Sequence, residues 1–360
     1  KGNLKKYSYE EINDLVEKFL NQVKIEFRGK ILKRAVIHSS ASIESAVAML
    51  ACIKINVYFS VIFEDLSLEA IEKRVKLFKP NIILTKSFNH FSNLKNIFKK
   101  KVFLLDVHSF NKDIFNKKFK SKTLKSSSNF FCLFTSGSTG VPKGIIHKYG
   151  GYSVWCKETC KAQFGMNNKS IVLAASDAGW INGHTYSLFG PLFFGGTSIL
   201  LESPIIILNE NILKKIKNLK ITILYLPVTL IRLLKSITKR KNFLIKSVKA
   251  LGSMGEPLAP DIGEWYEKFF RNKKKAIVNT YFQTETGGIL ISPKYNDHIF
   301  KSPHGSVGNP VSKFIEISKL DKLKREIKIL YPWPGIMSDV LNGKKVWNKY
   351  WDKRGKFRLF

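Results

Sequence analysis

Cysteine is scarce in this sequence, and no two cysteines have the spacing of a metal-binding pair. The four are Cys52, Cys132, Cys156 and Cys160, and none forms a C-x-x-C motif. Cys156 and Cys160 have the spacing of one helix face, but a zinc site needs two more ligands in register. We therefore interpret the cysteines as reduced, structural residues of a cytoplasmic protein.

Long apolar runs are also missing, since none reaches the ~18 residues of a membrane-spanning helix. The best candidate, 221–230, is short, contains Pro227 and is followed by Arg232. The first residues are polar and basic without an apolar stretch, so no secretory signal is predicted. The chain begins with Lys1 rather than Met, so we expect a native start upstream.

Acidic residues are few: 27 stand against 61 Lys and Arg, for a formal charge of +34. One interpretation is a surface for nucleic acid or anionic membrane. The other is compositional bias, because lysine vastly outnumbers arginine and the lysines are dispersed. Proteins that read bases or clamp phosphates usually favour Arg. The sequence favours bias, with weak attraction to polyanions as a by-product and no specific nucleic-acid partner.

What the sequence does have is enough apolar residues for a folded core, 44% of 360 residues. Between 5 and 85, predicted helices alternate with short apolar runs, the pattern of βαβ units and a parallel sheet. The predicted helices are 5–27, 44–54 and 68–78; the predicted strands are 34–39, 56–63 and 81–85. From 86 to 129 the chain is rich in Lys, Ser and Asn, and we predict a surface segment with one strand, 101–107.

The sequence is organised around 130–149, FFCLFTSGSTGVPKGIIHKY. The run 130–134 predicts a buried strand, and Ile145 and Ile146 predict the return strand of a hairpin. Between them lie hydroxyl side chains and glycines, whose uncovered N–H groups can form an anion nest, with Lys143 adding positive charge. The motif is neither G-x-x-x-x-G-K-[ST] nor G-x-G-x-x-G, and no G-x-S-x-G surrounds its serines.

The ten residues TSGSTGVPKG, 135–144, resemble the phosphate loop of the adenylate-forming enzymes. Two later segments agree in order and spacing: GEP at 255–257 and TYFQTETGG at 280–288. The resemblance implies that the first segment holds the β- and γ-phosphates of ATP, that GEP flanks the adenine, that Thr284 contacts the α-phosphate and that Glu285 binds Mg²⁺. The residues thereby assigned to ATP are Thr135, Ser136, Gly137, Ser138, Thr139, Gly140, Lys143, Gly255, Glu256, Pro257, Asn279, Thr280, Tyr281, Phe282, Gln283 and Thr284.

The residue types suit this chemistry. ATP brings about four negative charges, which N–H donors, a lysine and a divalent cation can neutralise. One carboxylate suffices because phosphate oxygens and waters complete the shell of Mg²⁺. A solvated loop carboxylate is the other interpretation of Glu285, and the two companion segments disfavour it. The reaction that fits is attack by a carboxylate on the ATP α-phosphorus, with Lys143, Thr284 and Glu285 as catalytic residues.

The segment DAGWINGHTY, 177–186, resembles the acyl pocket of short-chain acyl-CoA synthetases, although Asn182 stands where Thr is usual. A lone histidine such as His184 is also commonly structural. Phe282 stands where an indole closes the pocket in acetyl-CoA synthetases, and Met254 replaces a usual valine, so the size changes partly cancel. Acetate and propionate therefore stay open. The resemblance assigns the pocket to Trp180, Ile181, Asn182, His184, Met254 and Phe282, with Asn182 also the candidate CoA contact.

We thus expect an α/β fold, the large N-terminal domain of an adenylate-forming enzyme. Two βαβ-layered subdomains, at about 1–130 and 131–300, precede a β-barrel portion at 301–360. The resemblance places the ribose-binding aspartate and a small C-terminal domain, with its catalytic lysine, beyond Phe360. The expected function is ATP-dependent activation of a short-chain carboxylate, then thioester formation with CoA. The alternatives are an inactive remnant, a basic polyanion-binding domain or another acyl-adenylating ligase.

Overall fold

The computed structural model describes residues 3–26, 31–110, 118–135, 141–319, 325–330, 333–341, 343–353 and 355–358. The chain divides into two compact units. The first comprises Lys1–Gly150, Asp177–Gly179 and Ser338–Asn342; the second comprises Gly151–Ser176, Trp180–Met337 and Gly343–Phe360. The fold is α/β with parallel sheets, as the sequence predicts. The subdomain boundaries at about 130 and 300 stay a prediction.

The first unit is built on a seven-stranded sheet in the order β16-β6-β5-β2-β1-β3-β4. Its strands β1 to β5 run parallel, and the β5–β6 hairpin and β16 form an antiparallel edge. The strands are β1 Arg34–His38, β2 Tyr58–Ile62, β3 Ile82–Thr85, β4 Val102–Leu104, β5 Asn129–Thr135, β6 Lys143–Lys148 and β16 Asp339–Leu341. The predicted strand–loop–strand of 130–149 is therefore confirmed, and it belongs to the first sheet.

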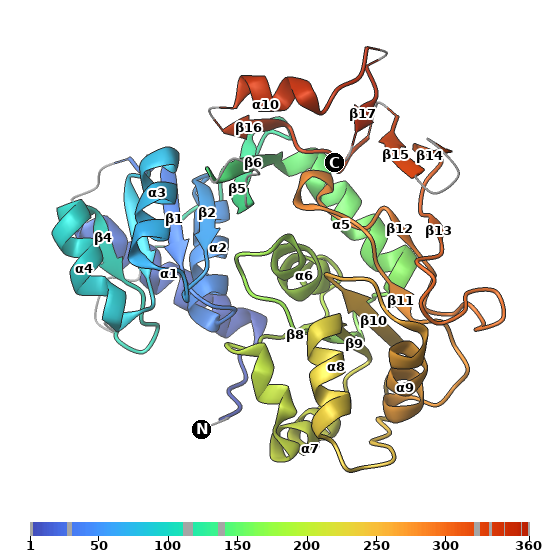
Figure 1. The fold of residues 1–360 in the computed structure, drawn as a ribbon. Helices are drawn as coiled ribbons and strands as arrows, with labels where there is room; N and C mark the ends of the chain where they lie inside the picture. The colour runs from blue at the N-terminus through green and yellow to red at the C-terminus, as the bar shows by residue number, and fades with distance from the viewer. Residues whose placement is uncertain are drawn as a thin grey trace. The chain divides into compact units, whose positions relative to one another are not determined.

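Helices cover both faces of this sheet (Figure 1). On one face α1 and α2 pack Phe19 and Cys52 against Ala35, and on the other α3 and α4 pack Val75 and Leu94 against the strands. Adjacent strand residues point to opposite faces, so apolar runs are needed on such strands. The helices are α1 Tyr9–Glu26, α2 Ile43–Lys54, α3 Leu68–Phe78 and α4 Phe88–Phe98.

Helix α4 corrects the sequence-based view of 86–129 as a surface segment with a single strand. The side chain of Ser87 caps this helix by accepting from the backbone N–H of His90. Phe91, Leu94 and Phe98 all pack toward the core. The helical spacing was present, but the abundant Lys, Ser and Asn on the outer face concealed it.

The second unit contains a five-stranded, wholly parallel sheet in the order β11-β10-β9-β7-β8. Helices α7, α8 and α9 pack on one face around Leu224 and Leu251. The other face packs against α5 and η2 through the rings of Phe164, Tyr186 and Tyr225. The elements are α5 Tyr149–Phe164, β7 Ile171–Ala174, η2 Gly183–Phe189, α6 Gly190–Phe193, β8 Thr197–Ile199, α7 Glu210–Asn218, β9 Ile223–Pro227, α8 Val228–Ile237, β10 Ala250–Met254, α9 Pro260–Phe270 and β11 Val278–Asn279.

Short antiparallel strands follow in the second unit. One pair joins β12 to β13, and a three-stranded sheet has the order β14-β15-β17. Their bounds are β12 Ile291–Ser292, β13 Asn309–Pro310, β14 Ile315–Lys319, β15 Arg325–Ile329 and β17 Phe357–Arg358, with helix α10 at Lys344–Lys349. Among the described residues, no helix has the length and apolarity to cross a bilayer.

Candidate functional site

Two of the three predicted ATP segments meet in the second unit because β10 and β11 are parallel neighbours. Ser253 pairs in register with Asn279, so the GEP turn and the TYFQTE segment leave the sheet at the same edge. Ser253 Oγ donates to Asn279 Oδ1 at 3.0 Å, and the Thr280 N–H and hydroxyl donate to the Ser253 carbonyl at 3.1 and 2.9 Å. The carboxyl ends of parallel strands are the usual ligand-binding edge of an open α/β sheet.

The GEP turn begins directly after Met254, which β10 buries. Gly255 has a φ of +88° and open space around its α-carbon, a conformation that favours glycine. Arg232 on α8 holds the turn, with its Nη1 3.2 Å from Glu256 Oε2 and its Nη2 3.5 Å from the Pro257 carbonyl. Arg232 is not among the residues predicted from the sequence. Its signal there is that it is an arginine in a lysine-rich chain, because a guanidinium can form two directed hydrogen bonds at once.

Asn279, a predicted ATP contact, is built into the framework of the sheet edge. Its side chain accepts from Ser253, and its Nδ2 donates to the carbonyls of Gly305 and Ser306 at 3.4 and 3.2 Å. Tyr281 bridges to Ile291 through backbone hydrogen bonds. These bonds fix the strand from which the Thr284–Glu285 turn departs.

The predicted metal-binding residue lies on a short, buried turn, the 3₁₀ helix η4 Thr284–Thr286. Thr286 closes the turn: its N–H and its hydroxyl both donate to the Gln283 carbonyl. Gly287 follows with a φ of +68°, which allows the chain to reverse. Glu285 is 6% exposed, and its Oε1 accepts a hydrogen bond from the Tyr350 hydroxyl at 2.7 Å. Burial raises the pKa of Tyr350, and the neighbouring carboxylate raises it further.

This donor set fits Mg²⁺ bound together with a polyphosphate. Glu285 supplies one carboxylate with a neutral hydrogen-bond donor beside it. Within the described part of the chain, no group of three or more His, Cys, Asp or Glu side chains gathers at a potential metal site. A hard cation would therefore take most of its ligands from phosphate oxygens and water, which is how Mg²⁺ usually binds nucleotides.

The predicted acyl segment forms an unusual helix behind this turn. Residues Gly183–Phe189 are a π-helix, a conformation often found at functional sites. Thr185 Oγ1 donates to the Gly287 carbonyl at 2.9 Å, and the Tyr152 hydroxyl lies 2.8 Å from the same Thr185 oxygen. The Ile289 N–H donates to the Tyr186 hydroxyl at 2.8 Å. The π-helix is thus bonded directly to the chain that follows Glu285.

Several predicted pocket residues come together through this helix, and others do not. Phe282 packs edge-on against Tyr186, with ring centroids 5.7 Å apart. His184 is fully buried, and its Nδ1 lies 3.3 Å from the Trp180 carbonyl. Ile181 is buried, whereas the Trp180 side chain is 54% exposed. Asn182 is partly buried, and its Oδ1 has no hydrogen-bond partner among the described residues.

The remaining predicted ATP residues belong to the first unit. Thr135 ends β5 and Lys143 begins β6, and the two are paired across the hairpin. The residues between them that were assigned to phosphate, Ser136, Gly137, Ser138, Thr139 and Gly140, lie outside the described residues.

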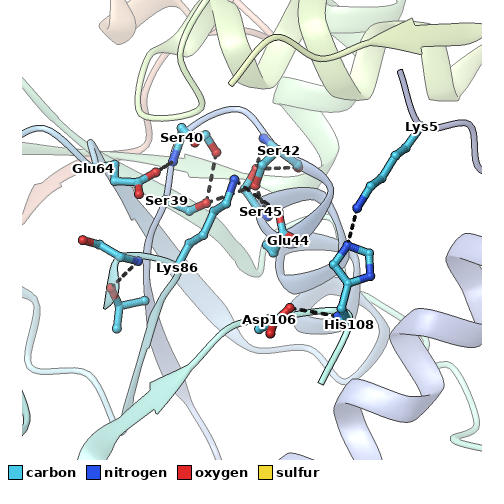
Figure 2. A network of polar contacts seen from close by, with 12 residues as sticks. Lys5, Ser39, Ser40, Ser42, Glu44, Ser45, Glu64, Lys86, Asp106 and His108 are labelled. Carbon is cyan, nitrogen blue, oxygen red and sulfur yellow. Dashed lines mark hydrogen bonds and ion pairs between the residues drawn. The ribbon is translucent and has the colours of Figure 1, made fainter. Parts of the chain in front are cut away.

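A second polar cluster lies at the carboxyl ends of β1, β2 and β3 in the first unit (Figure 2). The Ser40 N–H donates to Glu64 Oε2 at 3.1 Å, and the Lys86 ammonium lies 3.6 Å from Glu44 Oε2. Figure 2 shows the Glu64 carboxylate beside the backbone of Ser40, and the Lys86 side chain extending toward Glu44. Because Lys86 is paired with Glu44 and Glu64 accepts from a backbone N–H, we interpret the cluster as a structural network.

Burial shifts two titrating groups of the first unit in opposite directions. His38 Nδ1 lies 2.8 Å from the Thr85 hydroxyl, and its Nε2 lies 3.2 Å from the Glu64 carbonyl. Burial lowers the pKa of His38 to about 4, and His90 lowers it further. Burial raises the pKa of Asp177 to about 6, with added repulsion from nearby carboxylates.

The thiols are inert in this environment. All four cysteines are free and buried. Burial raises the pKa of Cys52 and of Cys132 to about 12, so their reactive thiolate forms are scarce at neutral pH. The burial of all four cysteines agrees with their interpretation as reduced, structural residues.

Comparison with known proteins identifies the family of the chain. Residues 2–332 match the AMP-binding enzyme family model, and the chain belongs to that family. It is 30% identical to the acetyl-coenzyme A synthetase of Chlorobaculum tepidum, covering 98% of this chain and 59% of that protein. The corresponding enzymes of Psychromonas ingrahamii and Helicobacter pylori strain G27 are 32% and 27% identical, over 94% and 96% of this chain and 58% of each relative. The chain thus spans somewhat more than half the length of these relatives.

A solved structure shows the same fold at low sequence identity. It is a crystal structure of an anthranilate CoA ligase in complex with anthranoyl-AMP, with a TM-score of 0.83 and 14% identity. The match covers 98% of this chain and 69% of that chain. The predicted fold class is therefore confirmed.

Proposed function

We propose that this chain is the nucleotide-binding part of an enzyme that activates a short-chain carboxylate, acetate or propionate, with ATP and passes the acyl group to CoA. The observation that carries the proposal is the shared sheet edge: β10 and β11 deliver GEP and TYFQTE from neighbouring parallel strands. Family membership supports the ligase class, and the acetyl-coenzyme A synthetase relatives support the acid and CoA.

In the proposed reaction, a carboxylate oxygen of the acid attacks the ATP α-phosphorus. The bond from that phosphorus to the bridging oxygen of the β-phosphate breaks, and pyrophosphate leaves with the bonding electrons. The CoA thiol, losing its proton, then attacks the acyl carbon and displaces AMP. Both steps depend on orientation and charge stabilisation rather than on a protein nucleophile.

Each proposed residue has a defined task. Lys143 places positive charge beside the leaving pyrophosphate, and Thr284 donates its hydroxyl to the α-phosphate. Glu285 holds Mg²⁺, which when bound neutralises phosphate charge. Gly255, Glu256, Pro257 and Tyr281 border the adenine. The residues that bound the acyl pocket are Trp180, Ile181, Asn182, His184, Met254 and Phe282, and Asn182 also contacts CoA. We place the enzyme in the cytoplasm, where its proposed substrates ATP and CoA are found.

ATP–pyrophosphate exchange tests the proposal. We expect the complete gene product to show exchange that depends on Mg²⁺ and on acetate or propionate, and this chain by itself to bind ATP weakly. The preferred acid is the one that gives the larger kcat/KM. Exchange with neither acid, combined with no ATP binding, would contradict the proposal. Binding of polyanions that falls steeply with salt and ignores ATP would favour a basic binding domain instead.

A second screen separates the CoA ligase from other acyl-adenylating ligases. The enzyme is supplied with ATP, acetate and either CoA or an acyl-carrier protein with its phosphopantetheine thiol. Thioester formation on CoA supports the proposal. Transfer to the carrier protein alone would assign the domain to a different ligase class.

A further inference from the structure

A hydrogen bond joins Glu285 to a residue far along the chain. The hydroxyl of Tyr350 donates to Glu285 Oε1 at 2.7 Å, and both residues are almost completely buried, at 4% and 6% exposure. An ionised carboxylate can only accept hydrogen bonds, and a tyrosine hydroxyl is a neutral donor. This contact orients the carboxylate and, unlike a contact from an ammonium group, it brings no charge of its own.

Tyr350 is itself held rigidly. Its ring stacks on that of Phe357, with centroids 5.3 Å apart and planes within 6°. Phe357 is fully buried and pairs with Ile329 in the antiparallel sheet β15–β17. Tyr350 also ends α10, with its N–H donating to the Trp347 carbonyl. A hydroxyl fixed from two sides in this way can define the position of its acceptor.

The backbone around Glu285 is anchored separately. The Met337 N–H donates to the Glu285 carbonyl at 2.7 Å, and Thr185 Oγ1 donates to the Gly287 carbonyl at 2.9 Å. These bonds place the turn but leave the three side-chain torsions of a glutamate undetermined. The contact from Tyr350 acts on the side chain, so its effect on the carboxylate is separable from the stability of the turn.

We propose that Tyr350 is a positioning residue for Glu285, holding its carboxylate in the orientation that binds Mg²⁺ beside ATP. The inference rests on the proposed function, because it assumes that Glu285 is the metal ligand. Hydrogen-bond partners of a ligating carboxylate commonly change metal affinity by 10–100-fold when they are removed. Tyr350 therefore belongs to the binding site functionally, although it need not touch either substrate.

The test compares ATP binding by the 360-residue chain in saturating Mg²⁺ with binding in EDTA. Isothermal titration calorimetry gives both dissociation constants, and their ratio measures the contribution of the metal. We expect Tyr350→Phe to raise the constant in Mg²⁺ about 10-fold and to leave the constant in EDTA unchanged. Glu285→Gln should remove the Mg²⁺ effect, and adding Tyr350→Phe to it should cause no further loss.

Tyr266→Phe is the matched control. The Tyr266 hydroxyl is buried in the same unit, and it donates to the backbone carbonyls of Leu224 and Gly252, at 3.1 and 3.3 Å, rather than to a carboxylate. We expect this variant to lower the melting temperature as much as Tyr350→Phe does while keeping the wild-type ratio. An unchanged ratio in Tyr350→Phe, with Glu285→Gln losing the Mg²⁺ effect, would overturn the role of Tyr350 alone. A full Mg²⁺ effect in Glu285→Gln, or no Mg²⁺-dependent binding by the wild type, would overturn the metal assignment as well.

Discussion

The two parallel sheets end in polar groups that are organised differently. At the carboxyl ends of the first sheet, Glu64 accepts a hydrogen bond from the Ser40 N–H, and Lys86 forms an ion pair with Glu44. At the edge of the second sheet, the buried carboxylate of Glu285 accepts a hydrogen bond from the neutral hydroxyl of Tyr350.

We infer from this difference that the charged side chains at the first edge stabilise the fold, whereas the carboxylate at the second edge serves to bind a ligand. Paired charges at the first edge contribute to the stability of their own unit and to its pH dependence. A buried carboxylate such as that of Glu285 at the second edge is a ligand that suits a hard cation. Substitutions at the first edge should therefore act on stability, and substitutions at the second should act on Mg²⁺ and ATP. Four predictions separate the packing of each unit from the charges and hydrogen bonds at the two edges, starting with the largest effect.

Thr185→Val should destabilise the second unit by about 3 kcal/mol. The variant deprives the Gly287 carbonyl and the Tyr152 hydroxyl of their partner, and each buried polar group left unsatisfied costs about 1–3 kcal/mol. Urea unfolding measures the change. Thr197→Val on β8 is the control, because Thr197 is exposed and its substitution should stay within about 0.5 kcal/mol. Equal losses in the two variants would show that the π-helix network adds no stability.

Asp177→Asn should stabilise the first unit at pH 7 by about 2 kcal/mol. The pKa of Asp177 is raised to about 6 in the folded state, so ionisation of this carboxyl disfavours folding. The contribution of Asp177 to stability is therefore present at low pH and is lost as the pH rises from about 3.8 to 6. The lowered pKa of His38, about 4, acts oppositely: its contribution is present above about 6.5 and lost as pH falls to 4.

The two groups therefore offset each other between pH 4 and 6. Without Asp177, the variant should lose stability more steeply on acidification, which denaturant unfolding at several pH values measures. His38→Gln is the complementary variant, and its stability should fall less between pH 6.5 and 4. If the stability of Asp177→Asn and that of the wild type changed in parallel with pH, the raised pKa of Asp177 would be contradicted.

Arg232→Lys should weaken ATP binding about threefold while changing stability by less than about 0.5 kcal/mol. Lysine cannot reach Glu256 and the Pro257 carbonyl together, as the fork of Arg232 does. The pair is exposed, so its contribution to folding is small. Lys235→Gln breaks another exposed pair on the same helix, with Asp261, and should leave ATP binding unchanged. Calorimetry on both variants decides whether the GEP turn needs Arg232.

Lys79→Gly should raise the stability of the first unit by about 0.5–1 kcal/mol, the smallest effect. Lys79 ends α3 with a φ of +53°, where glycine avoids the strain of a side chain. Lys76→Gly, one turn earlier within the same helix, should instead cost about 1 kcal/mol. Destabilisation by both substitutions, measured by thermal unfolding, would show that the left-handed cap carries no strain.

Much of the fold was predictable because its signals are local. The β5–β6 hairpin and the helices α2 and α3 follow from apolar spacing and from the loop between them. The apolar residues ahead of GSMGEP predict a strand at 247–251, whereas strand β10 runs over Ala250–Met254. Its residues Ala250 to Met254 pair with Ile223 to Pro227 of β9, and this pairing determines where the strand lies. Local pattern fixes the type of an element more firmly than its ends.

The residues that support the candidate site were less predictable. Thr284 and Glu285 were predicted from their motif, but Arg232 and Tyr350 lie 24 and 65 residues from their partners, Glu256 and Glu285. The π-helix Gly183–Phe189 was also not foreseen. Its conformation coincides with contacts that Thr185 and Tyr186 make to distant segments, and such contacts leave no periodic trace in a sequence.

By itself, the sequence determined which chemistry to expect: TSGSTGVPKG, GEP and TYFQTETGG are contiguous motifs whose residue types match the charge of ATP. The tertiary structure decided how that chemistry is supported. It placed GEP and TYFQTE on neighbouring strands, joined Thr185 to Gly287, and set the hydroxyl of Tyr350 against Glu285. The physical reason is that a motif is read along the chain, whereas the orientation of a buried carboxylate depends on donors brought to it only by folding.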